Sequence, residues 1–147
     1  MNRGLLRKLL RLSPAEWREL AWAQGALIRA WFAVRTRPEG RLLVPVPSSS
    51  EPAAQRAAVT AAAARLALAL ARVAAYGVFR PTCLVRAIAL QSMLRSRGFT
   101  GSSVRVGVRW QEGRFLAHAW VEYGGEVLAD PRVGAFDELA RLEVVKR

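Results

Sequence analysis

Apolar and polar residues in the first half of the chain recur at helical spacing. Ser13-Pro14-Ala15-Glu16 combines three helix-start signals: a serine N-cap, a proline at the first helical position and a glutamate three residues after the cap. The helix that follows is predicted to bury one face, formed by Trp17, Leu20, Ala21, Leu27, Ile28 and Trp31. A second long helix should begin near Ser50, run to about Tyr76 and end at Gly77. Between them, Thr36 to Glu51 is rich in proline and serine and is predicted to be a connector.

The second half changes from helical to strand periodicity. Thr82 is the expected N-cap of a helix that ends at Gly98 and whose apolar face comprises Leu84, Ala87, Ile88, Leu90 and Leu94. Valine then alternates with arginine from Val104 to Trp110, which predicts a strand. A turn at 111–113 leads to a second strand, Phe115 to Tyr123, and Gly124-Gly125 leads to a third, Glu126 to Asp130. Helices followed by one helix and an antiparallel meander indicate an α+β fold.

Length and composition narrow the classes of function. The chain has 147 residues, 52% of them hydrophobic, with a net charge of +12, which indicates one folded basic domain over residues 1–147 with a helical part at 1–80. With one cysteine and one histidine, the chain cannot supply the usual zinc ligand set or an intrachain disulfide. It also lacks a phosphate-binding loop, a dinucleotide fingerprint and a serine nucleophile elbow. The remaining candidates for chemistry are Cys83, His118 and Asp130.

These three residues are placed as a cysteine nucleophile, its base and an orienting carboxylate would be. Cys83 falls in the first turn of its helix, where free backbone N–H groups and the helix dipole favour a thiolate. His118 and Asp130 fall on neighbouring strands. Taken singly, each has an ordinary explanation: a buried cysteine, a packed histidine, and a turn aspartate before a proline. Together and in this order they favour a catalytic triad.

The loop between the second and third strands decides whether His118 and Asp130 share a face of the sheet. A two-residue loop at Gly124-Gly125 would pair Asp130 with Ala119 and place it on the face opposite His118. A three-residue loop, Tyr123-Gly124-Gly125, would pair Asp130 with His118 instead. The triad therefore predicts an odd-length loop or a bulge in this hairpin.

Residues 1–12 alternate basic residues with leucines, which is typical of an amphipathic helix. Such a helix packs on its own domain or a partner, or lies on a membrane surface. The segment lacks the apolar stretch and cleavage site of a signal peptide. Arg56, Arg65 and Arg72 interrupt the alanine-rich stretch, so we expect a buried helix there and no membrane span. Together with the single cysteine, these features indicate a cytoplasmic location.

Several motifs over roughly residues 81–131 resemble the transglutaminase-like, papain-like core of lasso peptide leader peptidases. They are Cys83-Leu84-Val85-Arg86-Ala87, Leu94-Arg95-Ser96-Arg97-Gly98, Gly107-Val108, Ala117-His118-Ala119-Trp120-Val121-Glu122 and Leu128-Ala129-Asp130. The resemblance implies a cysteine-protease core at 81–147, packed against the N-terminal helices, and no metal or cofactor. It gives Cys83 the role of nucleophile, His118 that of base and Asp130 that of orienting carboxylate. Arg86 and Glu122 stand at motif positions that surface and strand-edge roles explain equally well.

The resemblance also implies a substrate and partners. Members of this family cut a ribosomally made lasso precursor between leader and core, and a separate ATP-dependent cyclase then acts on the freed core. A small winged-helix domain presents the leader, either fused ahead of the protease or as a separate protein. Because residues 1–80 are read as helices, we expect the split form. Its partners would be the precursor peptide, a separate leader-recognition protein and the cyclase.

Other classes of function stay open. Arg105 and Arg109 on one strand face, and Arg3, Arg7 and Arg11 on one helix face, are candidate phosphate contacts of a nucleic-acid-binding domain. No nucleic-acid-binding motif accompanies them, so no nucleic acid is expected as a partner. A non-catalytic scaffold for precursor, recognition protein and cyclase is a further alternative. The same thiol, imidazole and carboxylate could also transfer an acyl group to an amine, which only product analysis would separate from hydrolysis.

Overall fold

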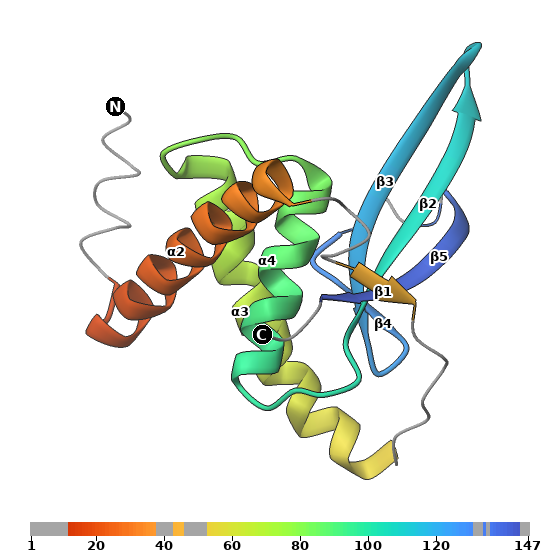
Figure 1. The fold of residues 1–147 in the computed structure, drawn as a ribbon. Coiled ribbons are helices and arrows are strands. Elements are labelled where there is room, and N and C mark those ends of the chain that lie inside the picture. Colours follow the sequence, from red (N-terminus) through yellow and green to blue (C-terminus); the bar gives the residue numbers. More distant parts are fainter. Residues whose placement is uncertain (1–11, 38–42, 46–52, 131–133, 135, 145–147) are drawn as a thin grey trace.

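Three helices pack on one side of a five-stranded antiparallel sheet (Figure 1). The computed structural model describes residues 12–37, 43–45, 53–130, 134 and 136–144. The elements are α2 (Pro14–Thr36), β1 (Leu43–Pro45), α3 (Ala53–Tyr76), α4 (Cys83–Ser96), β2 (Ser103–Gln111), β3 (Arg114–Tyr123), β4 (Glu126–Leu128) and β5 (Asp137–Val144). The strand order is β1-β5-β2-β3-β4. The α+β prediction is confirmed, while the amphipathic helix expected before Leu12 lies outside the described residues.

Local capping signals place the helix ends as expected. At the start of α2, the Glu16 carboxylate accepts a hydrogen bond from the Ser13 backbone N–H at 2.8 Å, and Ser13 Oγ accepts one from the Glu16 N–H at 3.3 Å. At the start of α4, Thr82 Oγ1 accepts from the Val85 N–H at 3.4 Å. After α4, Gly98 has a φ of +81°, the left-handed conformation that glycine adopts at helix ends. The helix beginnings at Ser13 and Thr82 and the end at Gly98 are therefore confirmed.

The buried face of α2 differs from the predicted one. Its fully buried positions are Ala23, Ala26, Leu27 and Ala30, whereas Trp17 and Ile28 are exposed and Leu20 and Trp31 pack only partly against the core. Small alanines let α2 approach α3 and α4 closely, and the bulky side chains are left at the flanks of the contact. The spacing identified a helix correctly and the burial of Leu27 is confirmed, but the expected face was wrong at Trp17, Ala21 and Ile28, because large apolar residues were taken as its centre.

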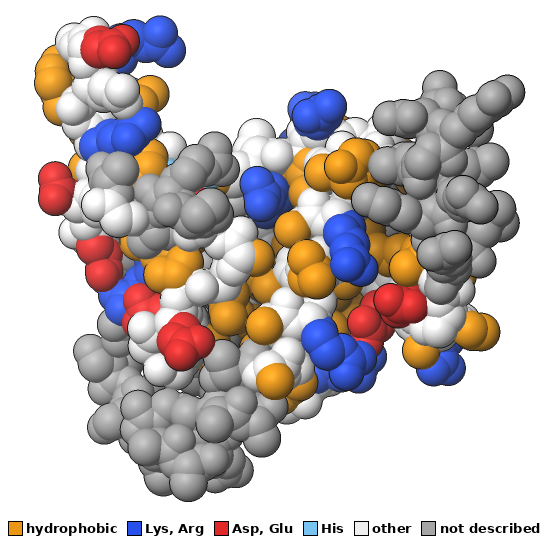
Figure 2. Space-filling model, turned by 180° about the vertical axis from the view of Figure 1, so that it is seen from behind, with side chains coloured by type: hydrophobic (Ala, Val, Ile, Leu, Met, Phe, Trp, Pro, Cys, Tyr) orange, Lys and Arg blue, Asp and Glu red, His pale blue; other side chains and the backbone are white. Residues whose placement is uncertain are grey.

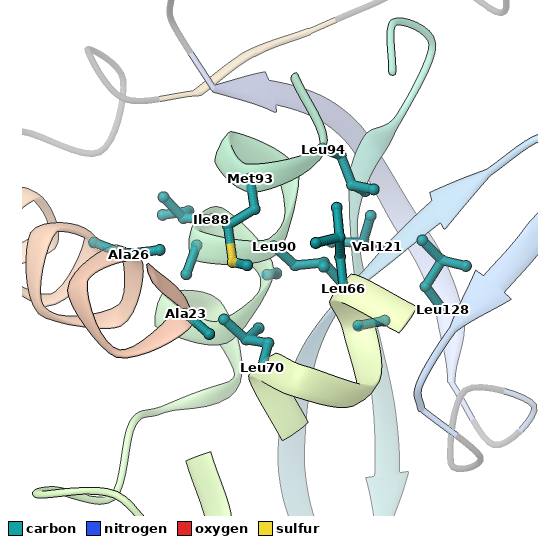
Figure 3. Packing of buried hydrophobic residues seen from close by; sticks show 14 of the residues in the cluster. Ala23, Ala26, Leu66, Leu70, Ile88, Leu90, Met93, Leu94, Val121 and Leu128 are labelled. Atoms are coloured by element: carbon teal, nitrogen blue, oxygen red, sulfur yellow. The ribbon is translucent and has the colours of Figure 1, made fainter. Parts of the chain in front are cut away.

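The core lies between the helices and the inner face of β3 and β4. Figure 3 shows Leu66 and Leu70 of α3 and Ile88, Leu90, Met93 and Leu94 of α4 meeting there, together with Ala23, Ala26, Val121 and Leu128. The alanine-rich helix is thus an inner helix, as predicted, with buried residues along Ala63 to Ala74. Within the described part of the chain, no helix combines the length and the hydropathy needed to cross a bilayer.

Two strands were not predicted. β1 lies inside the predicted connector and pairs with β5, and β5 pairs with β2, so the meander β2-β3-β4 is extended by two strands on its β2 side. β1 has only three residues, too few to show a strand period. β4 ends at Leu128, two residues earlier than expected.

Candidate active site

Cys83 opens α4 beside a small pocket. Its side chain is a free, half-buried thiol. The pocket, with a volume of about 30 Å³, is lined by residues of α3, α4 and β3 and by the residues at the end of β4: Ala67, Leu70, Ala71, Cys83, Arg86, Ala87, Leu90, Ala119, Trp120, Val121, Leu128, Ala129 and Asp130. Two residues predicted for the site, Cys83 and Asp130, therefore face one cavity, and Arg86 adds a positive charge to its wall.

The hairpin before Asp130 does not have the loop that the triad hypothesis predicted. Glu122 pairs with Val127, and the loop is the two-residue turn Gly124-Gly125, with φ values of +60° and +83°. A regular strand would then carry Asp130 away from His118. The structure interrupts the strand instead, because β4 ends and Ala129 takes a left-handed φ of +54°. The expectation of an odd-length loop was wrong, and the change of direction occurs after β4.

His118 and Asp130 form a buried pair. Asp130 Oδ2 lies 2.6 Å from His118 Nε2, and the two side chains are only 10% and 8% exposed. Since an ionised carboxylate only accepts hydrogen bonds, Nε2 donates the proton in this pair. The imidazole also lies close to two aromatic rings, with centroid distances of 6.1 Å to the ring of Trp120 and 5.0 Å to that of Phe136. Hydrogen bond and rings together hold the imidazole in one orientation.

The thiol of Cys83 and the imidazole of His118 are not in hydrogen-bond contact in the structure. No hydrogen bond between Cys83 and His118 occurs among the described residues. In the regular β2–β3 register, His118 alternates with Ala119 and Val121, which belong to the core beneath α4. The His118 side chain therefore leaves the strand on the other face. Asp130 faces the cavity of Cys83 and also contacts the imidazole, and Trp120 lines the same cavity and stacks on the imidazole.

A second buried ionic cluster lies near His118 on the sheet. Arg105, whose side chain is 7% exposed, bonds Glu122 at 2.8 Å and also Glu138 of β5. This corrects the alternative in which Arg105 contacts phosphate from a solvated strand face, because its guanidinium is enclosed between two carboxylates. Arg109 packs over the Phe136 ring, 4.7 Å from its centroid.

Two of these residues were not singled out in the sequence. Phe136 and Glu138 reach the site from the beginning of the β5 region, where the sequence showed no strand period. Neither stands in a motif, and only the pairing of β5 with β2 brings them near His118 and Arg105. Within the described residues, no group of three His, Cys, Asp or Glu side chains is placed to share a metal ion.

Comparison with known proteins gives one match. A family model described as the transglutaminase-like superfamily matches residues 26–141, well over half of the chain and all of the site just described. No curated protein and no solved structure matches the chain significantly.

Proposed function

Since the chain belongs to the transglutaminase-like superfamily, which includes cysteine proteases, we propose that it is a cysteine endopeptidase that removes the leader from a lasso peptide precursor. In this proposal Cys83 is the nucleophile, His118 the general base and acid, and Asp130 the carboxylate that orients the imidazole. The observation that carries the proposal is the buried 2.6 Å contact between His118 and Asp130, next to a pocket that also contains the chain's single thiol.

The direction of the His118–Asp130 hydrogen bond suits a base. In the neutral imidazole whose Nε2 donates to Asp130, the other ring nitrogen, Nδ1, carries no proton and can accept one. Asp130 stabilises the imidazolium that forms when the proton arrives. Catalytic hydrogen bonds are often long in a ligand-free enzyme and tighten when substrate binds. The proposal requires the thiol and Nδ1 to meet at the edge of β3, beside Asp130, in the substrate complex.

The reaction would proceed through an acyl-enzyme. Cys83 Sγ gives its proton to His118 Nδ1 and attacks the carbonyl carbon of the scissile peptide bond. When the C–N bond breaks, the proton passes from the imidazolium to the leaving amine, which is the new N-terminus of the core peptide. Water, deprotonated by the same imidazole, then attacks the thioester and releases the leader carboxylate together with the free thiol.

Backbone N–H groups at the start of α4 would stabilise the oxyanion. Thr82 already accepts from the N–H groups of Val85, through Oγ1, and of Arg86, through its carbonyl oxygen. The N–H groups of Cys83 and Leu84 come earlier in the same turn and have no intrahelical acceptor. They are the donors that we assign to the oxyanion, in a region where the helix dipole also favours negative charge.

The substrate and partners follow from the resemblance of the 81–131 motifs to lasso leader peptidases. The substrate would be the precursor peptide, presented by a separate winged-helix recognition protein, and the product would pass to an ATP-dependent cyclase.

Alkylation of Cys83 tests the catalytic assignment without knowledge of the substrate. Intact mass would follow labelling by iodoacetamide between pH 6 and pH 9 in the unmodified protein, His118→Ala and Asp130→Asn. Leu139→Ser, a change at an exposed apolar residue, serves as the control. We expect His118→Ala to slow labelling of the folded protein at least about tenfold near pH 6.5, which corresponds to an activation free energy about 1.4 kcal/mol higher. Leu139→Ser should leave the labelling rate unchanged. All proteins should react alike in denaturant. Equal rates for the folded unmodified protein and His118→Ala would refute the triad.

Cleavage of a precursor tests the rest of the proposal. With precursor and recognition protein present, Cys83→Ala should abolish leader release, and retained release would favour a scaffold. Added hydroxylamine distinguishes hydrolysis of the acyl-enzyme from transfer of the acyl group to an amine. An acyl transferase would convert the leader to its hydroxamate, while a protease yields mainly the carboxylate.

A further inference from the structure

The β2–β3 hairpin extends beyond the helices (Figure 1), and one of its faces is apolar and exposed. Trp110 and Phe115 are 71% and 62% exposed, and their ring centroids lie 6.3 Å apart. Val108 pairs with Ala117 one step further along the same face. We call these four residues the hairpin surface. In Figure 2 the hairpin projects at the upper left and carries hydrophobic as well as charged side chains. Large exposed aromatic residues gathered at one place commonly mark a binding surface.

The hairpin surface leads directly to the pocket of Cys83. Strand alternation places Phe115, Ala117 and Ala119 on one face of β3, and Ala119 lines the pocket. From Ala119 onward α4 covers this face, and before it the face is open, with Ala117 exposed. A chain lying along the hairpin surface would therefore arrive at the thiol.

The backbone of β3 is open at the same place. The two-residue turn Glu112-Gly113 makes Gln111 and Arg114 the hydrogen-bonded pair that closes the hairpin. Because backbone groups alternate along a strand, the N–H and C=O of Phe115 and Ala117 point away from β2. β4 pairs with β3 only from Val121 to Tyr123. Among the described residues, no strand covers the outer edge of β3 from Phe115 to Ala119.

The charges near this edge favour an acidic occupant. The outer part of the hairpin, residues 109–114, carries Arg109 and Arg114 against one carboxylate, Glu112. Closer to the helices Arg105 is paired with Glu122, and Arg86 lies in the pocket wall together with Asp130. The whole chain has a net charge of +12. Basic surroundings attract a negatively charged segment and raise its rate of encounter.

We propose that an extended acidic peptide, with an apolar side chain at every second position, binds as an added strand along the free edge of β3. Its apolar side chains contact the hairpin surface and its backbone bonds Phe115 and Ala117, so that it enters the pocket beside Cys83. Strand addition obtains affinity from main-chain hydrogen bonds and specificity from alternate side chains. The inference rests on the proposed function in that this peptide is the segment of substrate next to the scissile bond.

Binding can be measured on Cys83→Ala, so that no turnover is needed. The probe is a fluorescein-labelled peptide of five Val-Glu repeats, followed by fluorescence anisotropy at low salt. In this background, Ala117→Pro removes one N–H that points away from β2 and leaves the β2–β3 ladder intact, a position where strands tolerate proline. Ala117→Val keeps that N–H and serves as the matched control.

We expect Ala117→Pro to weaken binding about fivefold, the value of one net hydrogen bond, and Ala117→Val to change it less than about twofold. Phe115→Ser should weaken binding by at least about fivefold through lost apolar contact. Leu139→Ser, an exposed apolar residue on β5, should leave it unchanged. A peptide of Val-Lys repeats should bind more weakly than the Val-Glu peptide.

Equal affinity of folded Ala117→Pro and Ala117→Val would overturn the added strand, as would equal binding of the two peptides. Circular dichroism checks that each variant is folded, and Phe115→Ser decides the question if Ala117→Pro is not. These outcomes are independent of the alkylation experiment. Binding without a His118 effect on alkylation refutes the triad alone, and a His118 effect without binding refutes the added strand alone.

Discussion

Replacing Arg105 by methionine tests the buried ionic cluster of the sheet. The guanidinium of Arg105 is 7% exposed and bonds two carboxylates, Glu122 of β3 and Glu138 of β5. Methionine fills a similar volume along the apolar part of the arginine side chain but removes the charge. The variant would remove the cation that Glu122 and Glu138 share, and it would remove a link between β2 and both of its neighbouring strands.

The loss of stability expected for Arg105→Met follows from the exposure of the three side chains. Removing one partner of a fully buried ion pair costs about 3–5 kcal/mol, because the remaining charge stays desolvated. Here the Glu122 and Glu138 side chains are 22% and 44% exposed, so water recovers part of that loss. We therefore expect Arg105→Met to lower the free energy of unfolding by about 2–3 kcal/mol. For a chain of this length that is a fall in Tm of about 5–10 °C.

Urea unfolding followed by circular dichroism measures this loss, and a triple variant separates its cause. Arg105→Met combined with Glu122→Gln and Glu138→Gln removes all three charges, and the stability should return to within about 1 kcal/mol of the unmodified protein. A loss below about 0.5 kcal/mol in the single variant would refute the reasoning. A triple variant no more stable than the single one would also refute it, since loss of the cation that the two carboxylates share would then not be the cause.

Two further predictions concern local geometry. Gly107→Ala would place a Cβ 2.7 Å from the Trp120 ring and 2.9 Å from a backbone oxygen, so thermal unfolding should show a loss of about 1–3 kcal/mol. Hydrogen bonds from the backbone and side chain of Ser13 lower the pKa of Glu16 from the ordinary value of 4.5. The Glu16 charge therefore stabilises the protein fully above the unfolded-state pKa, and this stabilisation is lost as the pH falls through the lower folded-state pKa. Glu16→Gln should therefore lower Tm at pH 7 but not at pH 2, and an equal difference at both values would contradict this.

The helix ends could be predicted because their signals are local. Ser13 and Thr82 bond backbone groups only a few residues away, and Gly98 supplies a backbone conformation that other residues adopt at a cost. Such interactions depend on neighbours in the sequence and not on the rest of the fold. The choice of buried face on α2 failed for the opposite reason, because it depends on which helices approach it.

β5 could not be predicted from its residues. Asp-Glu-Leu-Ala-Arg-Leu-Glu-Val consists largely of good helix formers, and its alternation is broken where β5 shifts register against Val106 and Gly107 of β2. Leu139, omitted from the pairing at that shift, is 65% exposed. Long-range pairing with β2 overrides the local propensity. Phe136 and Glu138 reach the site through this strand, so the residues that surround His118 and Arg105 could not be found without it.

The contact between His118 and Asp130 forms against the register of the strands that carry it. Strand pairing alone would place Asp130 across from Ala119, whose side chain lies on the core face. Ala129, with its φ of +54°, interrupts that alternation at a cost of about 1–2 kcal/mol for a residue with a side chain. The buried Leu128 on one side of Ala129 and the hydrogen bond of Asp130 on the other oppose this strain. Hence the pair could be suggested from the sequence, since the residue types alone indicate that a histidine and an aspartate can bond. The contact was attributed to the wrong loop, because the left-handed residue that makes it possible is an alanine, which carries no turn signal.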